Sequence, residues 1–293
     1  MAKAKVGIIG GSGLGDALCE QTEGQTVAVE TPFGQPSDRI ILTTWDETDI
    51  AVLNRHGPGH LLNPSAVNYR ANIYALKRLG CTHVIASGAV GSLRDQYAPR
   101  QLVIPDQVID KTYRREGTFF DAGLAAHIEF AAPFCGVLRK HLLGCADAVE
   151  TTAHDGGTYV CMEGPAFSTR AESEMHRWWG GDLIGMTCMP EAKLAREAEM
   201  SYAMVCLVSD YDCWKPAPAD LDKHELLREI LDNLTDATAN AVKLIRTAVS
   251  RFGRIAETPS AAHDALEMAI WSDRAQIADE TKHALELLTG KYL

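Results

Sequence analysis

The sequence predicts an α/β fold, in which helices flank a central sheet of parallel or mixed strands. Short apolar runs recur through most of the chain, and several end in glycine or in turn-forming residues, as buried strands do. Segments with the apolar spacing of helices lie between several of these runs. Strands that alternate with helices are typical of α/β proteins.

The first expected strand covers residues 5–9, an apolar run that leads into the glycine-rich residues 10–15. A glycine cluster directly after a strand indicates a tight loop. The same reasoning places further strands at residues 39–44, 50–54, 82–87, 101–104, 159–162, 183–186 and 203–209.

Helices are expected at residues 65–79, 170–179 and 190–198, and a longer one runs from Leu221 to about Arg251. The long helix should pack on the sheet through an apolar stripe. This stripe consists of Leu226, Leu227, Ile230, Leu231 and Leu234.

The end of the chain is predicted to be a helical hairpin added to the main domain. Thr258 and Pro259 suit a helix start, Gly290 suits a helix stop, and residues 259–271 and 273–289 are amphipathic. The expected division is a main domain at residues 1–254 and a helical extension at residues 255–293.

Composition narrows the classes of function. The chain has 293 residues, of which 46% are hydrophobic, and its formal charge of −11 argues against general binding to nucleic acid or to anionic membranes. We expect no membrane span and no secretory signal, and therefore a cytoplasmic protein. The eight cysteines are scattered without zinc spacing, so we expect mostly buried thiols and no metal site.

The loop at residues 10–15 is the first candidate for ligand binding. Its glycines let backbone N–H groups approach an anion, and Ser12 adds a hydroxyl donor. A dinucleotide-binding fingerprint is disfavoured, because Asp16 stands where the third glycine would be needed. A plain tight turn remains the alternative.

Two further segments suggest an anion site. Arg55 and His56 follow the strand at residues 50–54, and a guanidinium can bind phosphate through two parallel hydrogen bonds. Residues 86–92 are small and rich in glycine, like the first loop, and we place them after a strand. Loops that follow neighbouring strands can share one pocket. The alternative is a loop in which Arg55 pairs with a surface carboxylate.

Asp210 and Asp212 close the strand at residues 203–209. Residues two apart in an extended segment point to the same side, so the two carboxyls should lie together. A desolvated carboxyl beside a second one has a raised pKa and can serve as a general acid. Turn-forming aspartates at a strand end are the alternative.

Three more residues are candidates for the same site. Phe167 could stack on a base, although a core position is the more common fate of an aromatic side chain. Met186 and Thr187 end a strand just before a helix, where a hydroxyl and helix N-terminal amides favour an anion.

Taken together, these motifs resemble the 5'-methylthioadenosine phosphorylases of the purine nucleoside phosphorylase family. The resemblance runs from about residue 6 to residue 250. It rests on Gly-Ile-Ile-Gly-Gly-Ser-Gly at 7–13, Arg-His-Gly-x-x-His at 55–60, Val-Asn-Tyr-Arg-Ala-Asn at 67–72, Glu-Gly-Pro-x-Phe-Ser at 163–168, Met-Thr-x-x-Pro-Glu at 186–191 and Ser-Asp-Tyr-Asp-Cys-Trp at 209–214.

The resemblance implies the nucleoside phosphorylase fold, a homotrimer that can pair into a hexamer, and no cofactor beyond inorganic phosphate as co-substrate. Asp210 would face N7 of the purine and Asp212 the 6-amino group, while Met186 and Phe167 would contact ribose and base. Leu226 and Leu227 are plausible walls of the 5' pocket. Phosphate would be held by Ser12, Arg55, His56, the amide of Ala89 and Thr187.

The reaction that the resemblance implies is phosphorolysis of S-methyl-5'-thioadenosine to adenine and 5-methylthioribose 1-phosphate. Two departures bear on it. Gly88 stands where many family members have a hydroxyl residue, and Lys223 and His224 lie where the family is often more apolar. The alternatives are a 5'-deoxyadenosine or other purine nucleoside phosphorylase, a hydrolase of the same fold, and a nucleoside-binding protein without turnover.

Overall fold

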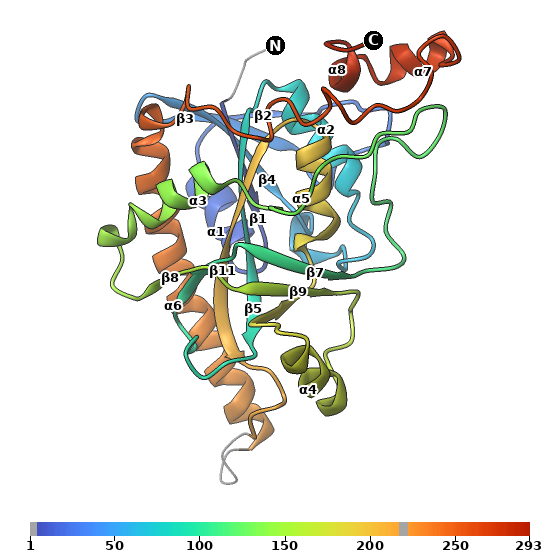
Figure 1. Cartoon of the computed structure of the whole chain (residues 1–293). Helices are drawn as coiled ribbons and strands as arrows, with labels where there is room; N and C mark the ends of the chain where they lie inside the picture. The colour runs from blue at the N-terminus through green and yellow to red at the C-terminus, as the bar shows by residue number, and fades with distance from the viewer. Residues whose placement is uncertain (1–4, 217–221) are drawn as a thin grey trace.

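An eleven-stranded mixed sheet forms the centre of the protein (Figure 1). The computed structural model describes residues 5–216 and 222–293. The strands are β1 (Val6–Gly10), β2 (Gln25–Val27), β3 (Ile40–Trp45), β4 (Thr48–Asn54), β5 (His83–Ser92), β6 (Leu102–Ile104), β7 (Gln107–Lys111), β8 (Ala153–Asp155), β9 (Thr158–Met162), β10 (Leu183–Gly185) and β11 (Ser201–Tyr211). Their main order is β2-β3-β4-β1-β5-β10-β9-β7, and β11, β6 and β8 branch from β5.

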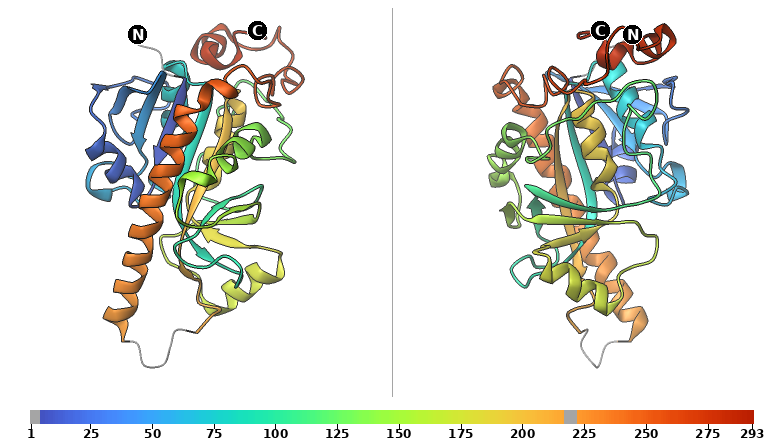
Figure 2. Two further views of the ribbon diagram at one scale, coloured as in Figure 1. Left: turned by 90° about the vertical axis from the view of Figure 1, so that its left-hand side faces the viewer. Right: turned by 45° about the vertical axis from the view of Figure 1, so that its right-hand side comes forward.

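Helices cover both faces of the sheet (Figures 1 and 2). They are α1 (Leu14–Gln21), α2 (Tyr69–Arg78), α3 (Gly136–Leu143), α4 (Arg170–Trp178), α5 (Cys188–Glu197), α6 (Lys223–Ser250), α7 (Asp279–Ala284) and α8 (Glu286–Thr289). Apolar residues of α1, α3 and α6 share one buried core with the sheet, and those of α2 and α5 share the other. The α/β fold with a mixed sheet is therefore confirmed.

The position of β5 decides where a ligand can approach. On one side, β11 pairs with β5 along its whole length, from His83 to Ser92. On the other side, β1 pairs only as far as Ala86, and β10 pairs only with Gly91 and Ser92. Residues 87–90 therefore have no strand partner on that side within the described part of the chain, and the sheet opens there.

The expected strands all exist, but one interpretation of them is wrong. Residues 86–92 belong to β5 and are not a loop after it, because they pair with β11 on one side of the strand. The elements β2, β7, β8, α1 and α3 were not expected, and their shortness explains this, since few residues carry a periodic signal. The predicted start of the long helix at Leu221 lies outside the described residues, and α6 begins at Lys223.

The C-terminal extension contains helix only in α7 and α8, so the expected helix at residues 259–271 is wrong. This stretch forms successive turns that end in a bridge between Ala126 and Ile270. Backbone bonds to the main domain replace helical ones, because the His127 amide donates to Ala269 and the Trp271 amide to Ala125. Tertiary contacts therefore override the amphipathic pattern.

The extension lies at the edge where the parallel strands begin (Figure 1). The Leu266 amide and the Tyr292 hydroxyl both donate to Glu199, two residues before β11. Nine residues of extended strand separate Ser201 from Asp210, which is about 30 Å. The extension is thus far from Asp210 of its own chain.

Two further expectations concern cysteines and membranes. Cys81, Cys135, Cys145, Cys161, Cys188 and Cys206 are free and buried, and Cys213 is free and exposed. Mostly buried thiols are therefore confirmed for the cysteines whose side chains are described. None of the described helices is long and apolar enough to span a bilayer.

We predict that the buried His83 weakens the fold in mild acid. Burial, reinforced by the nearby His263, lowers the pKa of His83 to about 4. The unfolded chain protonates this ring near pH 6.5, so proton uptake favours unfolding as the pH falls from about 6.5 towards 4. Between pH 7 and pH 5, the free energy of unfolding should fall about 1–2 kcal/mol less in His83→Gln than in the wild type. Urea unfolding at both pH values measures this difference, and His283→Gln, at an exposed position, should keep the wild-type pH dependence.

Candidate active site

The opening beside β5 is lined by the ends of β1 and β4. The Gly11 amide, after β1, donates to Ser87 Oγ at 3.3 Å, and Arg55 Nη1, after β4, donates to the Ser87 carbonyl at 2.7 Å. Gly11 must be glycine, because a Cβ there would lie 2.6 Å from both Arg55 Nη1 and the Ser87 carbonyl. The segments after β1 and β4 therefore do meet at Ser87, as the sequence predicted, although Ser87 lies within β5.

The Ala89 amide faces this opening. Backbone groups alternate in direction along a strand, so the Ala89 N–H points to the same side as the Ser87 carbonyl. On that side the Ser87 carbonyl meets Arg55, and no strand pairs with residues 87–90 within the described residues. The opening thus combines a backbone donor with a guanidinium.

Arg55 is held by a buried acid that the sequence analysis did not identify. Its Nε and Nη2 donate to the two carboxylate oxygens of Glu191, each at 2.8 Å, and Tyr202 donates to the same carboxylate at 2.8 Å. All three side chains are almost fully buried. Burial alone would lower the pKa of Arg55, but Glu191 raises it, so the guanidinium stays charged.

The ion pair with Glu191 limits how the Arg55 guanidinium can bind an anion. The Nε–Nη2 edge already binds Glu191, so this edge cannot grip an anion through two parallel bonds. One hydrogen on each terminal nitrogen remains, because a guanidinium has five N–H donors. Glu191 belongs to the Met-Thr-x-x-Pro-Glu motif, but residues 190–198 include four charged side chains, so the local pattern did not single it out.

His56 is buried and neutral. Its Nδ1 lies 2.8 Å from the Leu62 carbonyl, which can only accept, so Nδ1 carries the hydrogen. Burial, together with the charge of Arg55, lowers the pKa of His56 to about 4. At neutral pH its Nε2 is therefore a hydrogen-bond acceptor.

Ser12 and Thr187 approach the opening from two loops. Ser12 is partly exposed in the turn after β1, and Thr187 is buried at the start of α5, where its side chain makes no cap bond. Thr187 Oγ1 would lie 3.3 Å from a Cβ on Gly88. The same Cβ would lie 2.7 Å from the terminal methyl group of Met204, which would have to shift to make room for a side chain.

Asp210 and Asp212 lie next to Gly91, at the far end of the same opening. A Cβ on Gly91 would lie 3.3 Å from Asp210 Oδ1 and 3.4 Å from Asp212 Cβ. Ser209 Oγ donates to Asp210 Oδ2 at 2.6 Å. Burial raises the pKa of Asp210, and Asp212 adds to this effect against the opposing bond from Ser209. Asp212 Oδ2 is buried and has no hydrogen-bond partner among the described residues.

Met186 and Phe167 differ in their surroundings. Met186 packs against Gly164, where a Cβ would lie 2.5 Å from the methionine sulfur. Phe167 is 85% exposed and so is not a core aromatic. Both come from segments that follow neighbouring parallel strands, β9 and β10.

Leu226 and Leu227 are less buried than an apolar stripe in a core would be. Leu226 is half-buried and Leu227 is 55% exposed, both in the first turns of α6. The apolar core that α6 shares with the sheet takes its buried residues from Ala237 onwards. The start of α6 is capped by Asp222, whose side chain accepts from the His224 and Glu225 amides, and Lys223 and His224 are exposed.

These groups suit an anion at one end of the opening and a polar heterocycle at the other. The donors come from Arg55, the Gly11 loop, the Ala89 amide and Thr187. The carboxyls of Asp210 and Asp212 lie beside Gly91, two residues further along β5 than Ala89. Within the described residues, no group of three or more His, Cys, Asp or Glu side chains has the arrangement of a metal site.

The chain is similar to known phosphorylases over most of its length. The family model of the phosphorylase superfamily matches residues 5–250. The S-methyl-5'-thioadenosine phosphorylase of Geobacter sulfurreducens is 47% identical over 289 residues, which cover 98% of this chain and 99% of that protein. The protein of the same name from Gloeobacter violaceus is 45% identical, and the match covers 99% of this chain and 96% of that one.

Solved structures give the same result. The crystal structure of a methylthioadenosine phosphorylase from an antarctic soil metagenomic library has a TM-score of 0.89 at 44% identity and covers 98% of this chain and 99% of its own. The methylthioadenosine phosphorylase from Schistosoma mansoni in complex with adenine has a TM-score of 0.79 at 34% identity, with 98% of each chain covered.

We predict that Arg55 and Glu191 are strongly coupled in stability. Glu191→Leu should lower the free energy of unfolding by about 3–5 kcal/mol, because it leaves Arg55 buried without its counter-ion. The double variant Arg55→Met, Glu191→Leu should lose clearly less than the sum of the single losses. Urea unfolding of the wild type, Glu191→Leu, Arg55→Met and the double variant tests this coupling. Tyr202→Phe, which removes one bond to the same carboxylate, should cost only about 1 kcal/mol. Additive losses would contradict the coupling.

Proposed function

This chain belongs to the phosphorylase superfamily, and we propose that it cleaves S-methyl-5'-thioadenosine with phosphate to adenine and 5-methylthioribose 1-phosphate. It would thus be a glycosyltransferase that transfers a pentosyl group to phosphate. The observation that carries the proposal is the pairing of a buried carboxyl of raised pKa, Asp210, with a donor-lined opening on the same strand pair.

Asp210 and Asp212 would recognise adenine. Ser209 donates to Asp210 Oδ2, so a proton on this carboxyl belongs on Oδ1, the oxygen nearest Gly91. That O–H can donate to N7 of the purine. The free Asp212 Oδ2 can accept from the 6-amino group, because a buried acceptor without a partner gains most from a ligand donor.

Phosphate would bind in the opening beside residues 87–90. Ser12, Thr187, the Ala89 amide and the two remaining hydrogens of Arg55 would donate to it. His56 would act differently, because its Nε2 accepts a bond, and the monoprotonated phosphate dianion carries one O–H to donate. Gly88 adds no hydroxyl, but Thr187 Oγ1 lies 3.3 Å from the position that a Cβ on Gly88 would take, so Thr187 can supply a hydroxyl at this point.

The chemistry follows from these positions. As the bond between ribose and purine stretches, positive charge grows on the sugar and negative charge on the base. A proton from Asp210 neutralises the departing purine at N7. Phosphate, fixed on the other side of C1', stabilises the sugar cation and then forms the new bond to it. Met186 and Phe167 would hold ribose and base in the required alignment.

A 5'-deoxyadenosine or other purine nucleoside phosphorylase is the second candidate. Lys223 and His224 favour it, because they are exposed at the start of α6, close in sequence to Leu226 and Leu227, the proposed walls of the 5' pocket. Two charged or polar side chains at the mouth of the pocket tolerate a 5' hydroxyl better than an apolar rim does. They therefore favour a nucleoside with a 5' hydroxyl, such as adenosine, over 5'-deoxyadenosine, which has a methyl group there. A hydrolase or a binding protein without turnover would leave the donor-lined opening without a catalytic role.

The wider setting is also part of the proposal. The enzyme would need no cofactor, would work in the cytoplasm in purine and methionine salvage, and would assemble as a homotrimer that can pair into a hexamer. It would bind no nucleic acid. The phosphorylase domain would end near residue 254, in line with the family match to residue 250.

We predict phosphate-dependent release of adenine that depends on Asp210. Wild-type enzyme should release adenine from S-methyl-5'-thioadenosine only with phosphate, and faster than from adenosine or 5'-deoxyadenosine. Asp210→Asn should lower kcat by roughly 100-fold or more, since an amide cannot transfer the proton. It should also shift preference towards methylthioinosine, because an amide can both donate and accept.

The assay separates the alternatives. Asp155→Asn, an exposed aspartate on β8, is the matched control and should keep wild-type kinetics. Release without phosphate would indicate a hydrolase. Binding of S-methyl-5'-thioadenosine without release of adenine would indicate a nucleoside-binding protein, and faster turnover of a nucleoside with a different 5' group would support the second candidate.

A further inference from the structure

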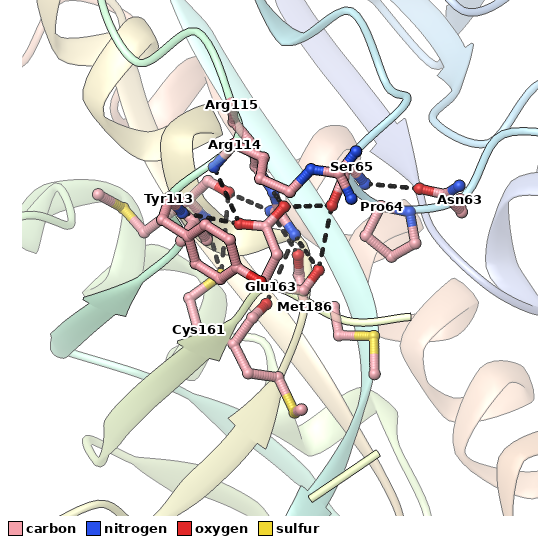
Figure 3. A network of polar contacts seen from close by, with 12 residues as sticks. Asn63, Pro64, Ser65, Tyr113, Arg114, Arg115, Cys161, Glu163 and Met186 are labelled. Atoms are coloured by element: carbon pink, nitrogen blue, oxygen red, sulfur yellow. Dashed lines mark hydrogen bonds and ion pairs between the residues drawn. The ribbon is translucent and has the colours of Figure 1, made fainter. Parts of the chain in front are cut away.

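A second buried ion pair, Arg115 with Glu163, joins the segments that carry Phe167 and Met186 (Figure 3). Arg115 follows β7, and Glu163 follows β9 directly. Their side chains are 2% and 6% exposed. Neither residue reaches the proposed reacting atoms, and none of the roles discussed above uses them.

Arg115 uses all of its hydrogen-bond donors. Its Nη1 donates to the carbonyls of Met186 and Met189, each at 2.6 Å. Its Nη2 donates to the carbonyls of Glu163 at 2.7 Å and Met162 at 3.4 Å, and its Nε lies 3.5 Å from Glu163 Oε1. A guanidinium has five N–H donors, and each has an acceptor here.

Glu163 extends the same network to a third segment. Its carboxylate accepts from the backbone amides of Tyr113 and Arg114, and from the hydroxyl of Ser65. Burial would raise the pKa of Glu163, but the bonds from Ser65 and Tyr113 outweigh burial and lower it, so the carboxylate stays ionised. Figure 3 shows Ser65 and Met186 on either side of the pair.

The network therefore fixes two strand ends relative to each other. β9 continues through Glu163 into Gly164 and on to Phe167, and β10 continues into Met186 and Thr187. The Met186 side chain packs directly on Gly164, so a shift of either segment moves Met186 against its neighbour. Of the proposed phosphate donors, Thr187 lies in the segment that Arg115 holds, between Met186 and Met189. Arg55, directly after β4, and the Ala89 amide on β5 are held by other contacts.

We propose that Arg115 is a positioning residue for the nucleoside half of the site, acting through the carbonyls of Glu163 and Met186. This inference rests on the proposed phosphorolysis. It assigns the alignment of ribose and base to Arg115 with Glu163, while the phosphate donor Arg55 is aligned by Glu191. Thr187 lies in the segment that Arg115 holds, so the phosphate site shares this one donor with the network.

The test compares KM for the nucleoside with KM for phosphate. Arg115→Lys keeps the charge but supplies only three donors from a different geometry, so some of the carbonyls lose their partner. We expect KM for the nucleoside to rise roughly tenfold to a hundredfold, with a fall in kcat, because a misplacement of about 1 Å suffices for such an effect. KM for phosphate should rise less, because Arg55 and the Ala89 amide keep their own contacts and Thr187 is the one proposed phosphate donor in the segment that Arg115 holds.

Two further variants separate positioning from general damage. Arg196→Lys is the matched control, because Arg196 is also buried and also donates to backbone carbonyls, those of Glu129 and Ala132, at the end of α5. It should lower the melting temperature and leave both KM values unchanged. Glu163→Gln keeps the Arg115 bonds to the carbonyls, and it should raise KM for the nucleoside less than Arg115→Lys does.

The outcomes are distinct. A wild-type enzyme without phosphate-dependent turnover would sink the proposed function itself. With active wild type, equal rises of both KM values in Arg115→Lys, or no rise at all, would overturn the role of Arg115. If Arg115→Lys does not fold, the binding of adenine to Arg115→Gln, which is neutral and keeps only two N–H donors, decides by isothermal titration calorimetry. Weaker binding than to Arg196→Lys supports the role, and equal binding overturns it.

Discussion

The pairing of β5 with β11 is the constraint on which the site depends. β11 follows β5 along its whole length, so β5 remains ordered where β1 has ended and β10 has not yet begun. A strand that is bonded on one side and open on the other presents backbone donors to a ligand without losing its own support. The same strand pair carries Gly88 and Gly91 on β5 and Asp210 on β11, so both ends of the opening belong to one rigid unit.

Two buried ion pairs are the second feature on which the site depends. Arg55 with Glu191 and Arg115 with Glu163 are each nearly inaccessible to water, and each arginine also bonds to backbone carbonyls. Such pairs add little net stability, because desolvation cancels much of the attraction. Their value here is geometric, since a planar guanidinium with several acceptors allows few alternative arrangements of the surrounding chain.

The C-terminal extension stands apart from this arrangement. It bonds to Glu199 and to residues 125–127, at the edge where the parallel strands begin, and it leaves Met268 and Trp271 exposed. Asp210 lies at the other end of β11. Any effect of the extension on catalysis in its own chain would therefore have to pass through the body of the sheet.

The sequence alone determined the α/β class, the positions of most strands, and the residues that gather at the opening, because apolar periodicity and glycine-bearing strand ends are local signals. It placed residues 86–92 in a loop and residues 259–271 in a helix, and both interpretations were wrong, because strand pairing and contacts with distant segments decide these conformations. Only the tertiary structure brought Glu191 to Arg55, and Arg115 to the carbonyls of Met186 and Met189. Glu191 and Arg115 act across 136 and 71 residues of chain, and no pattern within a sequence window carries that information.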